Sequence, residues 1–281
     1  MRFAKMHGIG NDFIVIDETE MKRDSKYRGA DHYRGLSHAL FPKDYCRRRF
    51  SIGADGVLYI VPPKNKAADF DFIMEIRNPD GSRAETCVNG LRCAALYWHL
   101  IKGKPKKMKI YTTAGIVDAE IFGVANGNGR VKITLEHPAV IKGKATIEID
   151  GKKYEYAEVD VGNPHAVIFM ESSVDEFPVE EIGHKISYHK NFPNGTNTEF
   201  VNVISDTRLK MRVHERGACE TQACGSGSIA IVKAAAENGV VKRDSAIEVE
   251  QPGGTLKIKL GDKIELEGEA EIVFVGELNV V

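Results

Sequence analysis

The sequence of 281 residues predicts an α+β protein with two pseudo-symmetric lobes. A unit of Cys-x-x-Gly, an apolar helix and a closing glycine occurs twice, beginning at Cys87 and Cys224 and ending at Gly103 and Gly239. The two cysteines lie 137 positions apart, about half the chain. Short segments of alternating apolar and polar residues flank both units. We therefore expect each lobe to be mostly β-strand around one helix.

Strand patterns dominate the first lobe. Residues 70–77 alternate in period two, so one face of that strand is expected to be buried. A helix is predicted over 42–50, with Pro42 in its first turn and three arginines near its end. The helix over 91–102 is apolar on most sides, which predicts that strands surround it. Further strands are expected at 13–17, 57–61, 108–112, 116–122 and 131–135.

The second lobe repeats this arrangement. Asp150-Gly151 predicts a hairpin turn, and 154–161 alternates as a strand does. A short helix is expected over 179–189. Residues 209–213 alternate again and lead to Glu215 and Arg216. The helix over 229–237 follows Cys224 and closes at Asn238-Gly239.

Composition excludes several classes of partner and site. A net charge of −1 gives no electrostatic footprint for nucleic acid or an anionic membrane. No signal peptide or membrane span is recognisable, so a cytoplasmic location is expected. An odd number of cysteines without a secretory signal favours reduced thiols: Cys46, Cys87, Cys93, Cys219 and Cys224. No metal is expected either, because C-x-x-C and H-x-x-x-H are absent.

Each helical unit places a thiol at a helix N-terminus. The amides and dipole there favour negative charge, which is expected to lower the pKa of the thiol and to accept a ligand carboxylate. Free cysteine is also a frequent core residue, so either thiol alone could simply be packed. The matched pair favours chemistry. Inversion of a carbon needs a base on one face and an acid on the other, which Cys87 and Cys224 could supply without a cofactor.

Five segments resemble the diaminopimelate epimerase family, in its order and across the whole chain. They are M-H-G-I-G-N-D-F (6–13), I-G-A-D-G (52–56), N-P-D-G-S-x-x-E-x-C-V-N-G-x-R-C (78–93), G-N-P-H (162–165) and E-R-G-x-x-E-T-x-A-C-G-S-G (215–227). The resemblance implies two lobes, 1–133 with 269–281 returning to it and 134–268, each a curved, mostly antiparallel sheet wrapped around a central helix. It also implies a homodimer and an active site in the cleft between the lobes.

The resemblance further implies cofactor-independent interconversion of LL-2,6-diaminopimelate and meso-diaminopimelate in lysine biosynthesis. Cys87 and Cys224 would be the catalytic thiols. His165 and Glu215 would support the site, although a histidine after Asn-Pro is equally typical of a core or turn. The remaining residues would bind the substrate through side chains or backbone amides: Asn11, Asn78, Val88, Asn89, Asn163, Asn197, Glu215, Arg216, Gly225 and Ser226. In the absence of the family pattern, Asn11 and Asn78 would be read as turn residues and Glu215-Arg216 as a surface pair.

Two residues depart from the family pattern. Val88 and Cys219 each stand where glycine is usual. Val88 would alter the carboxylate pocket if its backbone needed a glycine-only conformation. Cys219 is a possible oxidation partner of Cys224 and receives no catalytic role.

Two alternative functions remain open at this point. One is a cofactor-free racemase of another amino acid on the same scaffold. The other is a thiol redox or metal-binding protein, which the missing C-x-x-C and histidine ligands disfavour. A phosphate loop at G-S-G-S is weaker still, because the lysine of a P-loop is absent.

Overall fold

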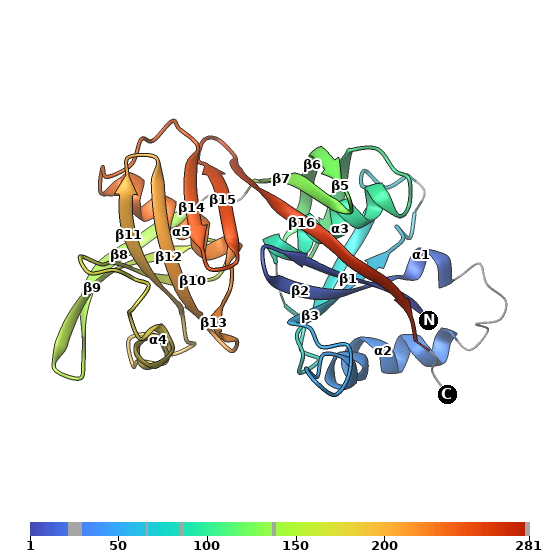
Figure 1. The fold of residues 1–281 in the computed structure, drawn as a ribbon, viewed down its shortest axis with the longest axis horizontal. Coiled ribbons are helices and arrows are strands. Elements are labelled where there is room, and N and C mark those ends of the chain that lie inside the picture. The colour runs from blue at the N-terminus through green and yellow to red at the C-terminus, as the bar shows by residue number, and fades with distance from the viewer. Residues whose placement is uncertain (22–29, 66, 85–86, 137–138, 279–281) are drawn as a thin grey trace. The chain divides into compact units, whose positions relative to one another are not determined.

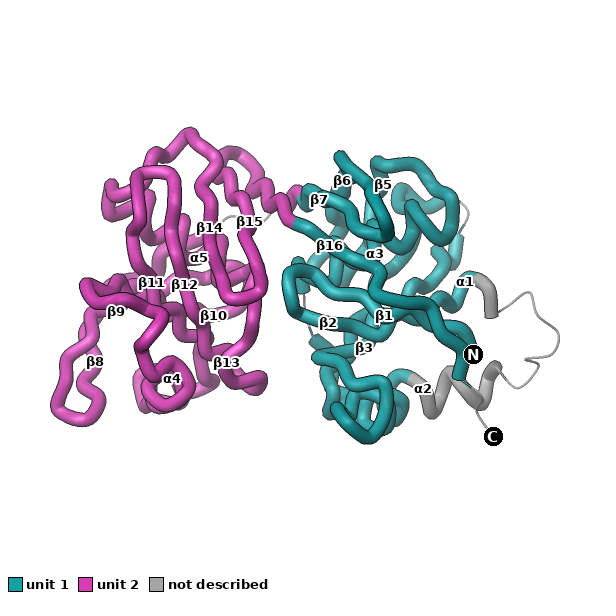
Figure 2. The backbone as a smooth tube through the Cα atoms, in the orientation of Figure 1, with its two compact units in different colours: residues 1–133, 269–281 teal, residues 134–268 magenta. Residues whose placement is uncertain are grey.

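The structure is a computed structural model and describes residues 1–21, 30–65, 67–84, 87–136 and 139–278. It divides into two compact units, unit 1 (Met1–Ile133 with Glu269–Val281) and unit 2 (Thr134–Gly268) (Figure 2). Each unit consists mainly of strands around one buried helix, which confirms the α+β prediction (Figure 1). Among the described residues, the helices are all too short or too polar to cross a membrane.

The strands of unit 1 form a closed ring. Neighbouring strands pair in chain order from β1 to β7, and β16 pairs with both β7 and β1, so the two ends of the sheet meet. In Figure 1, β16 runs beside β1. The β2–β3 and β4–β5 pairs are parallel. The strands are β1 (Arg2–Gly8), β2 (Asn11–Asp17), β3 (Gly56–Val61), β4 (Phe72–Arg77), β5 (Lys107–Thr112), β6 (Gly115–Ala125), β7 (Asn128–Leu135) and the end of β16 (Ile264–Glu277).

Helix α3 (Val88–Leu100) is enclosed by this ring. It buries residues on every side, as its apolar sequence predicts, and Leu91 and Leu96 are completely inaccessible to solvent. Burial of each such leucine contributes about 1.5–3 kcal/mol. The helix begins directly after Cys87 and ends at Leu100. Gly103 follows with a left-handed φ of 62°, which is incompatible with a continuing α-helix. The core of unit 1 therefore holds the start of α3 in a fixed position.

The helix predicted over 42–50 is wrong in both bounds. Helix α2 (Ala30–Tyr45) contains Pro42 in its interior and ends before the arginines. Phe41 is buried and stacks on Tyr45 with ring centroids 4.2 Å apart. This packing outweighs the loss of the backbone hydrogen bond that Pro42 cannot donate within the helix. Arg49 adopts a left-handed φ of 69°, which ends any helical run there. The sequence also gave no sign of β1 or of the short α1 (Glu18–Met21).

Unit 2 wraps an open sheet around its own helix, α5 (Gly225–Glu237). Its strand order is β16, β15, β14, β12, β11, β10, β9, β8, with β13 added beside β12. Most pairs are antiparallel, whereas β10–β11 and β12–β14 are parallel. The other elements are β8 (Val140–Ile149), β9 (Lys152–Asp160), β10 (Pro164–Phe169), α4 (Val179–Ser187), β11 (Asn197–Ser205), β12 (Arg208–Glu215), β13 (Cys219–Thr221), β14 (Ile247–Gln251) and β15 (Gly254–Lys259).

Candidate active site

Cys87 caps helix α3 through its side chain. Its backbone is extended, and Sγ accepts a hydrogen bond from the amide of Gly90 at 3.4 Å. The same sulfur lies 3.7 Å from Oδ1 of Asn11, at the start of β2. Asn89 Nδ2 also donates to that oxygen, at 3.1 Å. The structure thus brings together three residues that the sequence assigned to one site: Asn11, Cys87 and Asn89.

A partly exposed charge network holds the Asn11 side chain in place. Asn11 Nδ2 donates to Asp55 Oδ2 at 2.9 Å, and Arg48 bridges Asp55 and Asp12 at 2.7 and 2.6 Å. Burial opposes ionisation of Asp12, but hydrogen bonds from Arg48 and Lys5 outweigh it and lower the pKa of Asp12 to about 2. Asp12 therefore stays charged at neutral pH. Asp12 and Asp55 lie within the family-like segments 6–13 and 52–56, but their pattern in the sequence did not predict this role.

Cys224 caps helix α5 in the same way. Its Sγ accepts from the amide of Gly227 at 3.3 Å and lies 3.5 Å from Ser226 Oγ. Its own amide donates to Gln251 Oε1 at 2.8 Å, and Gln251 Nε2 donates to Ser228 Oγ at 3.0 Å. The predicted residues Gly225 and Ser226 form the first turn of α5. Gln251, which the sequence did not single out, anchors the turn that carries the second thiol.

Beside Cys224 lies a buried His165–Glu199 pair. His165 Nδ1 is 2.6 Å from Glu199 Oε1, and the other ring nitrogen is 3.0 Å from Asn163 Oδ1. A side chain at Gly227 would place Cβ 2.9 Å from Glu199 Oε1 and 3.3 Å from the Cys224 sulfur, so only glycine fits between them. The His165–Glu199 pair thus lies next to the second thiol, and Asn163 is connected to this pair through the His165 ring. Glu199 was missed, although a glutamate before Phe200 in an otherwise uncharged strand start was a visible signal.

The expected lowering of the thiol pKa is wrong for Cys224. Burial, followed by the negative charges of Glu215 and Glu199, raises the pKa of Cys224 well above its ordinary value. The Ser226 hydroxyl and the Gly227 amide act in the opposite direction but contribute less. Burial also raises the pKa of Glu215. Cys224 is therefore held as a thiol at neutral pH, which suits a proton donor.

Asn197 and Arg216 are hydrogen-bonded where β11 begins and just after β12 ends. Asn197 begins β11 in register with His165, and its Oδ1 accepts from the amide of Arg216 at 2.8 Å. The exposed Arg216 side chain donates to Asn194 O at 2.8 Å. Glu215 accepts from Thr221 Oγ1 at 2.5 Å. These contacts orient the Glu215–Arg216 pair rather than leave it as two solvated surface charges.

The contacts described for Asn78 do not connect it to the first thiol, whereas Val88 lies in the first turn of α3, directly after Cys87. Asn78 Nδ2 donates to Ser82 Oγ at 3.0 Å within its own turn, so the contacts described for it explain the turn and do not link it to Cys87. Val88 is the first residue of α3 and is absent from the described residues with positive φ. Its backbone is therefore ordinary, and the departure from glycine carries no strain. Cys219, in contrast, has a φ of 62°, the conformation in which glycine is favoured.

Comparison with known proteins gives the family directly. The model of the family described as "Diaminopimelate epimerase" matches residues 3–140 and 157–278. The diaminopimelate epimerase of Carboxydothermus hydrogenoformans is 38% identical over 99% of both chains. Diaminopimelate epimerase 1 of a Nostoc species is 36% identical, also over 99% of both.

Similarity to solved structures extends the comparison to the fold. A probable proline racemase from Agrobacterium radiobacter superposes with a TM-score of 0.69 at 13% identity, covering 100% of this chain and 93% of that one. At that identity the likeness concerns the fold alone. The two diaminopimelate epimerases and the family model instead match nearly the whole sequence, and the ranges that the family model matches contain Cys87 and Cys224. The chain belongs to the diaminopimelate epimerase family.

Proposed function

We propose that the chain interconverts LL-2,6-diaminopimelate and meso-diaminopimelate, as a step of lysine biosynthesis. Membership of the family supports the reaction. The observation that carries the proposal is the pair of matched thiols: Cys87 and Cys224 each cap a helix and each accept a backbone amide three residues on. Such a pair can act as base and acid in one inversion.

In the proposed reaction, one thiolate removes the α-proton and the opposite thiol delivers a proton to the other face of the same carbon. The C–H bond breaks and a new one forms, and the two sulfurs exchange protonation states, so the reverse reaction uses the same groups with their roles exchanged. The raised pKa of Cys224 supports its protonated form as the donor in one direction. The mechanism requires both sulfurs to reach one carbon from opposite sides.

The carbanion-like state needs stabilisation, because the α-hydrogen beside a carboxylate is very weakly acidic. The first turns of α3 and α5 offer backbone amides that helical hydrogen bonding does not use, and both helix dipoles favour negative charge there. We assign Val88, Asn89, Gly225 and Ser226 as donors to the substrate carboxylate at the reacting centre. Preorganised donors of this kind lower the barrier where charge develops. No cofactor is part of the proposal.

The second end of the substrate would be held by polar side chains. Arg216 is exposed and already oriented by Asn197 and Asn194, and a guanidinium can bind a carboxylate through two parallel hydrogen bonds. Side-chain amides and a side-chain carboxylate of the protein can together bind the distal ammonium and the distal carboxylate of the substrate. We assign this role to Asn11, Asn78, Asn163, Asn197 and Glu215. A substrate lacking one of these end groups would leave these polar partners unpaired and should react poorly.

Proton NMR in heavy water tests the function. Reduced protein with LL-diaminopimelate and no added cofactor is expected to form meso product that carries deuterium at the inverted carbon before the remaining substrate is labelled. L-Lysine, which lacks the distal carboxylate, should stay unlabelled. Labelling of proline or glutamate but not of diaminopimelate would instead assign the scaffold to another amino acid, and absence of labelling in all of them would contradict the thiol mechanism.

We also propose that the enzyme acts in the cytoplasm as a homodimer. Three consecutive residues of β16, Val273, Phe274 and Val275, are each about half exposed, an arrangement that a second copy could cover. Light scattering of the purified protein is expected to give twice the chain mass of 31.1 kDa. Replacing Phe274 by glutamate should shift the protein to monomers, and a monomeric wild type would contradict the proposal.

A further inference from the structure

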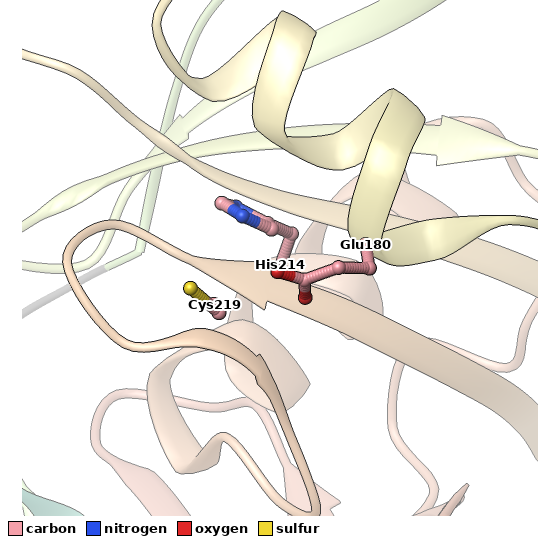
Figure 3. Close-up of side chains that lie close together, drawn as sticks. All are labelled: Glu180, His214 and Cys219. Carbon is pink, nitrogen blue, oxygen red and sulfur yellow. The ribbon is translucent and has the colours of Figure 1, made fainter.

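Three potential metal ligands converge on one side of unit 2, away from any role assigned above. A carboxylate oxygen of Glu180, a ring nitrogen of His214 and the sulfur of Cys219 all lie within 4.8 Å of one another. Figure 3 shows them approaching from the start of α4, from β12 and from the tip of the β12–β13 hairpin. His214 and Cys219 are only five positions apart, but Glu180 precedes His214 by 34 positions, so sequence spacing did not reveal the cluster.

The imidazole of His214 gives an independent sign of a missing ligand. Its side chain is almost completely buried, and Nε2 has no hydrogen-bond partner among the described groups. Its Nδ1 lies 3.0 Å from Ser187 Oγ, which is itself paired with Thr198. A metal-binding histidine typically uses its second nitrogen in this way, since that bond fixes the tautomer and aims the free nitrogen at the ion. A buried polar nitrogen without a partner is otherwise costly.

The other two proposed ligands, Glu180 and Cys219, lie close together, and their exposed side chains can still move. Glu180 Oε2 accepts from the amide of Glu220 at 2.7 Å, which holds the carboxylate beside the hairpin. The Cys219 sulfur lies within 4.8 Å of a carboxylate oxygen of Glu180, so one ion could contact both groups after a small movement. Tetrahedral ligands of zinc lie about 3.3–3.8 Å apart. Both residues are exposed, so closing the cluster by about 1 Å requires only surface side chains to move.

We propose that Glu180, His214 and Cys219 form a binding site for one divalent transition-metal ion of the zinc class. Nitrogen, sulfur and carboxylate donors together select such ions over magnesium or calcium, which prefer oxygen alone. Three protein ligands leave a fourth position for water. The ion would tie α4 to the hairpin whose turn carries Arg216, and would thereby stabilise that turn.

Cobalt titration of the full chain tests the site. Wild-type protein, reduced, is expected to bind Co²⁺ with a thiolate-to-cobalt absorption in the near ultraviolet that Zn²⁺ displaces. Cys219→Gly should lose one equivalent of bound ion together with that absorption. Because the residue has a left-handed φ of 62°, glycine suits the backbone and the variant is expected to fold. Glu180→Gln should keep the absorption but bind at least about 10-fold more weakly.

A matched removal of another thiol provides the control. Cys87→Ser should bind the ion as the wild type does, because Cys87 lies in unit 1. Zinc should raise the melting temperature of the wild type but not that of Cys219→Gly. Equal absorption and affinity in the wild type and Cys219→Gly would assign the metal to other thiols and overturn the proposal, as would a wild type that binds no cobalt.

Discussion

Replacing either Cys87 or Cys224 by serine is expected to lower the rate of epimerisation by about 10²–10⁴-fold, the usual contribution of a positioned acid or base. A serine hydroxyl fits the same helix cap but does not ionise near neutral pH, so the proton path is cut on one face. The measurement is formation of meso-diaminopimelate from the LL isomer, followed by NMR. Both variants should retain the fold, because the cap survives.

Isotope exchange gives this prediction a second, sharper readout. Each serine variant keeps one thiol, which can remove and return a proton on its own face but cannot invert the carbon. In heavy water each variant should therefore exchange the α-hydrogen of at most one epimer, and the two variants should choose opposite epimers. Cys219→Ser is the matched control and should epimerise at the wild-type rate. Inversion at the wild-type rate in either catalytic variant would exclude the two-thiol mechanism.

The sequence predicted those features that depend on local pattern. The alternation of apolar and polar residues over 70–77 predicted β4. The apolar residues on most sides of the helix after Cys87 predicted that strands surround α3. The two cysteine caps followed from Cys-x-x-Gly before a helical run. The helix over 42–50 failed because it was built on the local preference of Pro42, whereas the burial of Phe41 decides the helix in the fold.

Features that depend on long-range contacts could not be predicted in this way. Arg48 meets Asp12 across 36 positions, and His165 meets Glu199 across 34. The pKa of Cys224 shows the consequence most clearly. The local sequence predicts the helix dipole, which favours the thiolate form of Cys224. It does not predict the burial and the two carboxylates that disfavour the thiolate. Local reasoning thus found the thiol and gave the wrong direction for its pKa.

Removal of the Glu199 carboxylate is expected to have the largest effect on stability in unit 2. The His165–Glu199 pair is completely inaccessible to solvent, with 2.6 Å between Nδ1 and Oε1. Glu199→Ala leaves the imidazole buried beside a cavity, and loss of one member of a buried pair costs about 3–5 kcal/mol. Glu199→Gln keeps the shape and an acceptor, so its cost should be about 1–3 kcal/mol. Urea denaturation measures both.

The glutamine variant also tests the electrostatic link to the thiol. The negative charge of Glu199 destabilises the Cys224 thiolate and so raises the pKa of Cys224; removing the charge must lower that pKa. Alkylation of Cys224 by iodoacetamide, followed peptide by peptide, should therefore begin at lower pH in Glu199→Gln than in the wild type. Glu155→Gln removes an exposed carboxylate from β9 and should leave both stability and the alkylation profile unchanged. An unshifted profile in Glu199→Gln would mean that burial and Glu215 control the pKa of Cys224 without Glu199, and that Glu199 serves only to hold His165.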